Sequence, residues 1–163
     1  MNNSYTNEAI WCLLMTNKKL VPSQITSTIE DYLEAILVLS ETKGFAQVTE
    51  IANNLSISKA SVTEMLAKLK TMGFVKYEKY GTITLTETGS EIAEKVKIKH
   101  DLLNAFLLLI GVSEENANAD CCVMEHNLSK ETVEKLTIFY QFLLKEKQAD
   151  ILERFTKYSA TKN

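Results

Sequence analysis

The sequence contains little proline, glycine or cysteine and no long hydrophobic run. One Pro and five Gly, placed between periodic segments, predict a mostly helical chain. Three Cys form a poor disulfide framework, because the count is odd and one lies far from the other two; this favours a reducing, cytoplasmic environment. No apolar run reaches the roughly 18 residues of a membrane span, and the N-terminus lacks the basic start of a signal peptide, so no membrane partner is expected.

The chain also lacks an excess of positive charge. Its net charge is −3, so any binding of nucleic acid must come from a local basic face. Hydrophobic residues make up 45% of the 163 residues and charged residues 24%, which suits an ordinary core and argues against global disorder. The length fits one domain or two small ones.

Local signals in the first half predict three helices. Ser27, with Glu30 three residues later, forms a capping box that opens a helix ending at Gly44. Apolar periodicity then predicts a short helix over 48–57 and another over 59–72. Two helices joined by a tight turn are the helix-turn-helix layout.

The period changes after Gly73. Residues 74–86 alternate apolar and polar side chains, with a break at 79–81, which predicts a β-hairpin. A helix-turn-helix followed by a hairpin is a winged helix, in which the second helix enters the major groove of DNA.

The second half is predicted to be helical throughout. Thr88 opens a second capping box before a long helix over 91–110, which Gly111 ends. Ser113 starts another helix, and Ser129 caps the last one, after which a charged tail follows.

The predicted groove-facing helix and hairpin carry the candidate DNA-binding residues. Hydroxyls suit phosphates and base edges, and the lysines make this segment locally positive, although a solvated helix face explains any single lysine equally well. Glu64 repels phosphate unless it accepts a hydrogen bond from a cytosine amino group. The candidates are Ser58, Lys59, Ala60, Ser61, Thr63, Glu64, Lys68, Lys79 and Tyr80.

Residues 121–126 suggest half of a metal site. On a helix, Cys122, Glu125 and His126 stand at i, i+3 and i+4 and share one face, which brings thiolate, carboxylate and imidazole together. Cys121 points about 100° away and is expected in the core. A buried cysteine beside a surface Glu-His pair is the alternative interpretation.

Two other predicted helices add donors of the same kind. Asp31 and Glu34 are one turn apart beside the apolar stripe of the first helix. His100 precedes the strongly apolar run 102–110 of the long helix, where a lone histidine is usually a core or boundary residue.

From about Thr28 to about Phe142 the chain resembles the diphtheria toxin repressor and manganese transport regulator family of bacterial metal-dependent repressors. The segments that carry the resemblance are EDYLEAI (30–36), VTEIANNLSISKASVTEMLAKL (48–69), YEKYGTITLTETG (77–89), KHDLLNAFLLLIGV (99–112) and MEHNLS (124–129).

The resemblance implies a mainly α fold with a small β-hairpin: an N-terminal winged helix-turn-helix and a C-terminal helical dimerisation domain. The expected divisions are 1–23, an extension that is either an added helix or an artefact of start-codon choice, 24–90 for DNA binding, and 91–163 for metal binding and dimerisation. The implied partners are a second copy of the chain and a palindromic operator in double-stranded DNA.

The resemblance also implies a ligand set, which is mixed between two types of family member. The positions are Asp31, Glu34, His100, Cys122, Glu125 and His126. Manganese-type members share Asp31 but have Glu at the position of Cys122, whereas iron-type members have that Cys but Met at position 31. Asn104 and Asn118 replace two residues of the iron-type ancillary site. The missing SH3-like domain is typical of the shorter, manganese type.

We therefore expect a metal-responsive repressor of manganese or iron uptake genes, with Mn(II) first, Fe(II) next, and Zn(II) or Co(II) binding in vitro. Two other functions stay open: a winged-helix regulator that senses a small organic ligand, and a zinc hydrolase using Cys122, Glu125 and His126. The hydrolase gives the winged helix no role, so we expect no enzyme.

Overall fold

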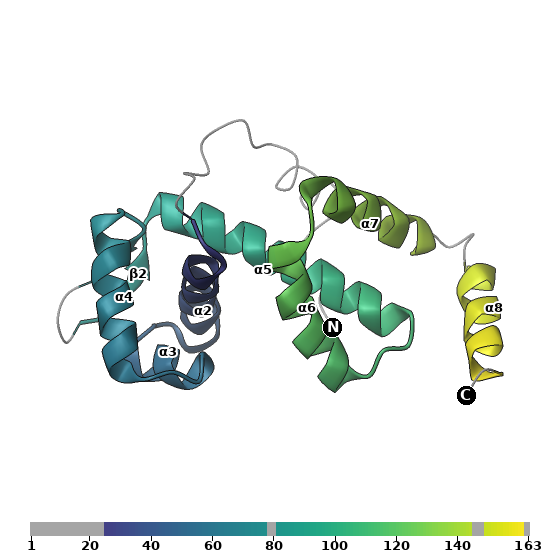
Figure 1. Cartoon of the computed structure of the whole chain (residues 1–163), viewed down its shortest axis with the longest axis horizontal. Helices are drawn as coiled ribbons and strands as arrows, with labels where there is room; N and C mark the ends of the chain where they lie inside the picture. Colours follow the sequence, from purple (N-terminus) through teal and green to yellow (C-terminus); the bar gives the residue numbers. More distant parts are fainter. Residues whose placement is uncertain (1–24, 78–80, 145–148, 162–163) are drawn as a thin grey trace. The chain divides into compact units, whose positions relative to one another are not determined.

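The computed structural model describes residues 25–77, 81–144 and 149–161 (Figure 1). It divides into two compact units between Lys97 and Ile98, within the long helix α5 (Glu87–Leu109). The predicted fold class, mainly α with a small β-hairpin, is confirmed. The predicted N-terminal extension, 1–23, lies outside the described residues. Among those that are described, no helix has the length and apolar character needed to span a bilayer.

The first unit is a winged helix-turn-helix. Its two strands pair antiparallel, with Val75 opposite Leu85 and Lys76 opposite Thr84, as the alternating pattern predicted. The elements before α5 are α2 (Ser27–Lys43), α3 (Val48–Asn54), α4 (Lys59–Thr71), β1 (Val75–Lys76) and β2 (Thr84–Leu85).

Apolar stripes of α2, α3 and α4 meet the hairpin in one core. Periodicity correctly placed the inward faces, because each stripe recurs every three or four residues and so returns to the same side of its helix. The fully buried side chains include Ile29, Leu33, Ile36, Ile51, Val62, Leu66, Leu69 and Ile83.

Both predicted capping boxes were wrong. The N-cap of α2 is Thr26, whose hydroxyl accepts a hydrogen bond from the amide of Ile29, and Ser27 is already helical. At α5 the hydroxyl of Thr86 accepts from the amide of Gly89 at 3.1 Å, so the helix starts before Thr88. A cap is chosen by backbone conformation, which the pattern of side chains does not reveal.

Gly89 therefore lies in the first turn of α5 and not between elements. A Cβ at this position would stand 2.0 Å from the backbone oxygen of Phe74, far inside contact distance. Thr86 binds the same oxygen through its amide at 2.9 Å. Only glycine allows α5 to begin this close to the residue that precedes β1.

The second unit contains the rest of α5, α6 (Glu114–Asn127), α7 (Lys130–Leu143) and α8 (Ala149–Ala160). Ser113 and Ser129 cap α6 and α7, as predicted. The predicted charged tail was wrong, because α8 is a helix. Its charges pair one turn apart, Asp150 with Arg154 and Glu153 with Lys157, which supports a helix surface.

Candidate metal centre and nucleic-acid interface

Glu125 lies at the centre of the polar cluster of the second unit. Its side chain is 1% exposed, although carboxylates are almost never buried without a partner. One oxygen, Oε2, lies 3.1 Å from Nδ1 of His100, and the other, Oε1, lies 3.3 Å from Nε2 of His126. A desolvated carboxylate between two imidazoles is stabilised by N–H groups that the rings donate or by a cation that the three side chains share.

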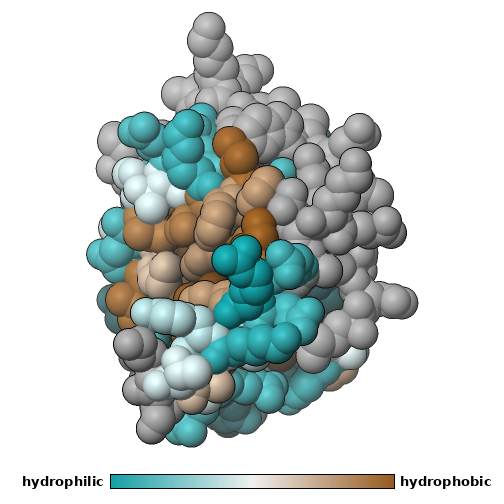
Figure 2. Space-filling model, turned by 90° about the vertical axis from the view of Figure 1, so that its right-hand side faces the viewer, coloured by the Kyte–Doolittle hydropathy of each residue, from teal (hydrophilic) through white to brown (hydrophobic). Residues whose placement is uncertain are grey.

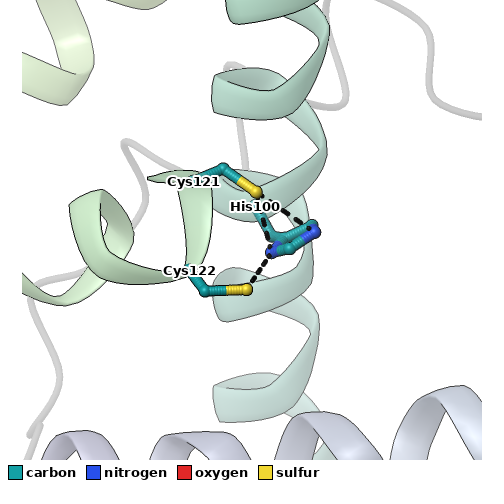
Figure 3. A group of neighbouring side chains, drawn as sticks. All are labelled: His100, Cys121 and Cys122. Atoms are coloured by element: carbon teal, nitrogen blue, oxygen red, sulfur yellow. Dashed lines mark hydrogen bonds between the residues drawn. The ribbon is translucent and has the colours of Figure 1, made fainter. Parts of the chain in front are cut away.

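Two cysteines of α6 approach His100 of α5 (Figure 3). The sulfur of the exposed Cys122 lies 3.8 Å from Nδ1 of His100, and Glu125 reaches the same nitrogen. Cys122 and Glu125 thus share a face of α6, as their spacing predicts. The thiol of Cys122 is therefore close enough to ligate a cation together with His100.

Cys121 has a different place. It is fully buried in the core of the second unit, as predicted, but it also lies 3.6 Å from Nδ1 and 3.5 Å from Nε2 of His100. Nearly equal distances put the sulfur beside the ring rather than in line with one nitrogen. The thiol also donates to the carbonyl of Asn118 at 3.3 Å.

The pKa of Cys121 is raised to about 12, mainly by burial and also by the neighbouring Cys122 and Glu125. The side chain therefore remains a neutral thiol at physiological pH and packs against the imidazole. Sequence spacing missed this contact because the two residues are 21 positions apart.

The donor set fits a divalent transition metal. His100 and His126 offer imidazole nitrogens, Glu125 offers carboxylate oxygens, and Cys122 offers a thiol. The ligand atoms of His100, Cys121 and Cys122 all lie within 4.8 Å of one another. Nitrogen and sulfur donors this close together, with a carboxylate oxygen of Glu125 beside His100, are typical of first-row metal sites.

Asp31 and Glu34 stand one turn apart on α2, in the first unit, and both are half-buried. Their part in metal binding stays a prediction. Asn104 and Asn118 form a neutral pair, in which Nδ2 of Asn104 donates to Oδ1 of Asn118 at 3.0 Å.

The predicted DNA-binding residues of α4 lie on its exposed side, but several hydroxyls are engaged by the helix itself. Ser58 is the N-cap and accepts from the amide of Ser61 at 3.1 Å. Thr63 donates to the carbonyl of Lys59 at 2.9 Å. These hydroxyls hold the N-terminal turn of α4 in shape.

The lysines and Glu64 point to solvent from the same helix. Lys79 and Tyr80, the predicted hairpin contacts, lie outside the described residues. A groove beside α4 adds residues that the sequence interpretation missed, because they come from the start of α3 and from the hairpin. Its lining comprises Gln47, Val48, Thr49, Lys59, Thr63, Ala67, Tyr77 and Gly81.

Comparison with known proteins agrees with both halves of this arrangement. Residues 24–83 match the family described as iron dependent repressor, N-terminal DNA binding domain. Residues 86–152 match iron dependent repressor, metal binding and dimerisation domain. The chain belongs to the diphtheria toxin repressor and manganese transport regulator family.

Relatives of this repressor family carry the name HTH-type transcriptional regulator MntR. The protein of Geobacillus kaustophilus strain HTA426 is 40% identical over 123 residues, which are 76% of this chain and 87% of the relative. The protein of Lysinibacillus sphaericus strain C3-41 is 37% identical over 129 residues, 79% of this chain and 91% of the relative.

Solved structures of the family share the fold. The manganese regulator SloR is 31% identical with a TM-score of 0.62, covering 70% of this chain and 54% of that one. ScaR with bound Zn²⁺ is 29% identical with a TM-score of 0.58 and the same coverage. The present chain thus spans about half the length of these solved chains.

As a member of this repressor family, the chain is a metal-responsive, DNA-binding transcriptional repressor whose partners are DNA and a second copy of itself. The family consists of DNA-binding regulators. A metal is its cofactor.

Proposed function

We propose that this repressor controls genes for manganese uptake, with Mn(II) as corepressor and Fe(II) next in order. The donor chemistry supports this ranking only in part. Asp31, Glu34 and Glu125 are hard oxygen donors that suit Mn(II), whereas the thiol of Cys122 favours Fe(II), Co(II) or Zn(II). Because affinity rises toward zinc in any such site, availability in the cell is expected to select the metal.

We propose Asp31, Glu34, His100, Cys122, Glu125 and His126 as the ligands. The single observation that carries this set is the buried carboxylate of Glu125 between two imidazoles. A bound cation supplies the positive charge that this carboxylate lacks.

The order of these residues along the chain suggests how metal controls DNA binding. Asp31 and Glu34 precede the helix-turn-helix, and the other four follow it. In the metal-free protein the carboxylates repel one another. More than one arrangement of the two winged helices in the dimer is therefore populated. Neutralising that repulsion favours one spacing, suited to a palindromic operator whose half-sites lie about one helical turn, or a multiple, apart.

Such control requires the metal to bind the DNA-competent state much more tightly than the other state. Shifting a population from 1:99 to 99:1 needs about 10⁴-fold tighter metal binding to the DNA-competent state.

The second unit also offers a surface for the second copy. Large apolar side chains remain exposed on α7 and α8, and Figure 2 shows hydrophobic side chains gathered on one face of the molecule. The exposed large apolar residues of these two helices, with Leu144 at the C-cap of α7, form the α7–α8 patch: Ile138, Phe139, Phe142, Leu144, Ile151, Phe155 and Tyr158. Patches of this kind on a soluble protein mark interaction sites.

Metal titration of DNA binding tests the proposal. Wild-type protein is expected to bind its promoter at least about 100-fold more tightly with Mn(II) than after chelation, whereas Asp31→Ala and His126→Ala should no longer respond to metal. Glu115→Gln, an exposed acidic position on α6, is the matched control and should respond like wild type.

Unchanged metal response in both ligand variants would reject the ligand set. Equal binding after exhaustive chelation of the wild type would favour the alternative, a winged-helix regulator that senses a small organic ligand.

A further inference from the structure

The outermost line of α4 consists of two small residues around one long acidic side chain. Ala60, Glu64 and Ala67 follow one another at i, i+4 and i+7, on the side opposite the buried Val62 and Leu66. Alanine methyl groups on either side allow the helix to approach a surface closely. Glu64 is then the side chain that reaches furthest along this line.

Glu64 does not have the usual role of a surface glutamate. Lys68 stands one turn later, in the favourable order for a helical ion pair. Nevertheless, Glu64 forms no hydrogen bond or ion pair among the residues that the structure describes. Its charge is felt by the phenol of Tyr32, whose pKa is raised first by burial and then by Glu64. A negative charge is thus kept unneutralised on a helix that must approach polyanionic DNA.

We propose that Glu64 reads a cytosine in each half of the operator, an inference that rests on the DNA-binding function above. An ionised carboxylate only accepts hydrogen bonds. In the major groove, guanine presents the acceptors N7 and O6, and thymine presents O4, so all of these repel it. Cytosine offers its N4 amino group, whereas adenine sets its amino group beside the acceptor N7.

Glu64 thereby acts in two ways. It gains a charge-assisted hydrogen bond at a cytosine, and it weakens binding wherever an acceptor or a phosphate takes that place. The second effect explains why an acidic residue is tolerated on a DNA-reading helix: it lowers affinity for all sequences but lowers it least for the correct one.

Selection from a random duplex library, with Mn(II) present, tests this role. The full-length wild-type protein should enrich a two-fold symmetric motif with one strongly preferred cytosine per half. Glu64→Gln should keep the rest of the motif but change that cytosine to adenine, because glutamine pairs with N6 and N7 of adenine. Glu64→Ala should lose preference there by about tenfold or more and bind unrelated DNA more tightly at low salt.

Glu91→Gln, an exposed acidic position at the start of α5, is the control and should leave the motif unchanged. Melting curves confirm that each variant is folded. An unchanged cytosine in the Glu64→Gln motif would overturn the proposal for Glu64 while the repressor function stands. Failure of the wild type to enrich any sequence with Mn(II) would overturn both.

Discussion

The two units of the chain differ in how completely they bury their own apolar residues. The first unit packs side chains from α2, α3, α4 and both strands into one core, and the exposed large apolar residues in its described part are Phe45 and Ile57. The cluster of buried core residues in the second unit comprises Leu103, Leu107, Ala117 and Cys121. The α7–α8 patch of the same unit remains exposed.

This difference indicates that the two units are stabilised in different ways. The first unit satisfies its hydrophobic residues within one chain, as a small domain that folds independently does. The second leaves apolar surface and a buried carboxylate that a second copy and a cation are suited to complete. The stability of the second unit is therefore expected to depend on protein and metal concentration, through mass action. The stability of the first unit is expected to be independent of both.

The largest expected effect is on the core of the first unit. Leu66 is fully buried, so Leu66→Ala should lower the free energy of unfolding by about 2–5 kcal/mol through lost burial and a cavity. Urea denaturation at two protein concentrations measures this cost, which should be the same at both. Ile57→Ala, at an exposed position, is the control and should change stability by about 0.5 kcal/mol or less.

A smaller effect is expected at the α7–α8 patch. Phe155→Ser removes an aromatic side chain from α8 and should weaken dimerisation by about tenfold or more, because buried aromatic residues often dominate interfaces. Sedimentation equilibrium measures the dissociation constant. Thr156→Ala, the adjacent exposed position, should leave it unchanged. Equal dimer affinity of Phe155→Ser and wild type would remove α8 from the interface.

The smallest expected effect distinguishes the two adjacent cysteines. In a Cys12→Ser background at pH 8, iodoacetamide should modify Cys122 and leave Cys121 intact, because the thiolate is the nucleophile and Cys121 is buried with its pKa raised to about 12. Mass spectrometry of Cys121→Ser and Cys122→Ser measures each thiol alone. Mn(II) should slow labelling of Cys122; rapid labelling of Cys121 would contradict its place in the core.

Most of the fold could be predicted from the sequence because apolar residues that recur at helical intervals lie on the buried face of their helix. Leu33 on α2 and Leu66 on α4 recur with their neighbours at helical intervals and are both fully buried. The capping predictions failed because Ser27 and Thr88 have Glu three residues later, as a capping box requires, whereas the residues that cap the helices, Thr26 and Thr86, do not. Helix α8 was missed because its paired charges look like a solvated tail.

Spacing and the resemblance proposed the members of the candidate site, but neither could predict how His100, Cys122 and Glu125 are arranged. Spacing placed Cys122 and Glu125 on one helical face, and the resemblance supplied His100. It could not show that Glu125 is the buried member or that Cys121 contacts His100, because both follow from the packing of α6 on α5. Tertiary packing between distant segments has no local sequence signal.

The close approach of Gly89 to the backbone oxygen of Phe74 restricts how this DNA-binding unit can be reused in engineered proteins. A chimaera that joins residues 25–86 to a foreign helix must carry glycine at the third position of that helix, because the hydrogen of glycine is all that fits beside the oxygen of Phe74. A graft with any larger residue there would displace the strand that follows Phe74 and, with it, the wing.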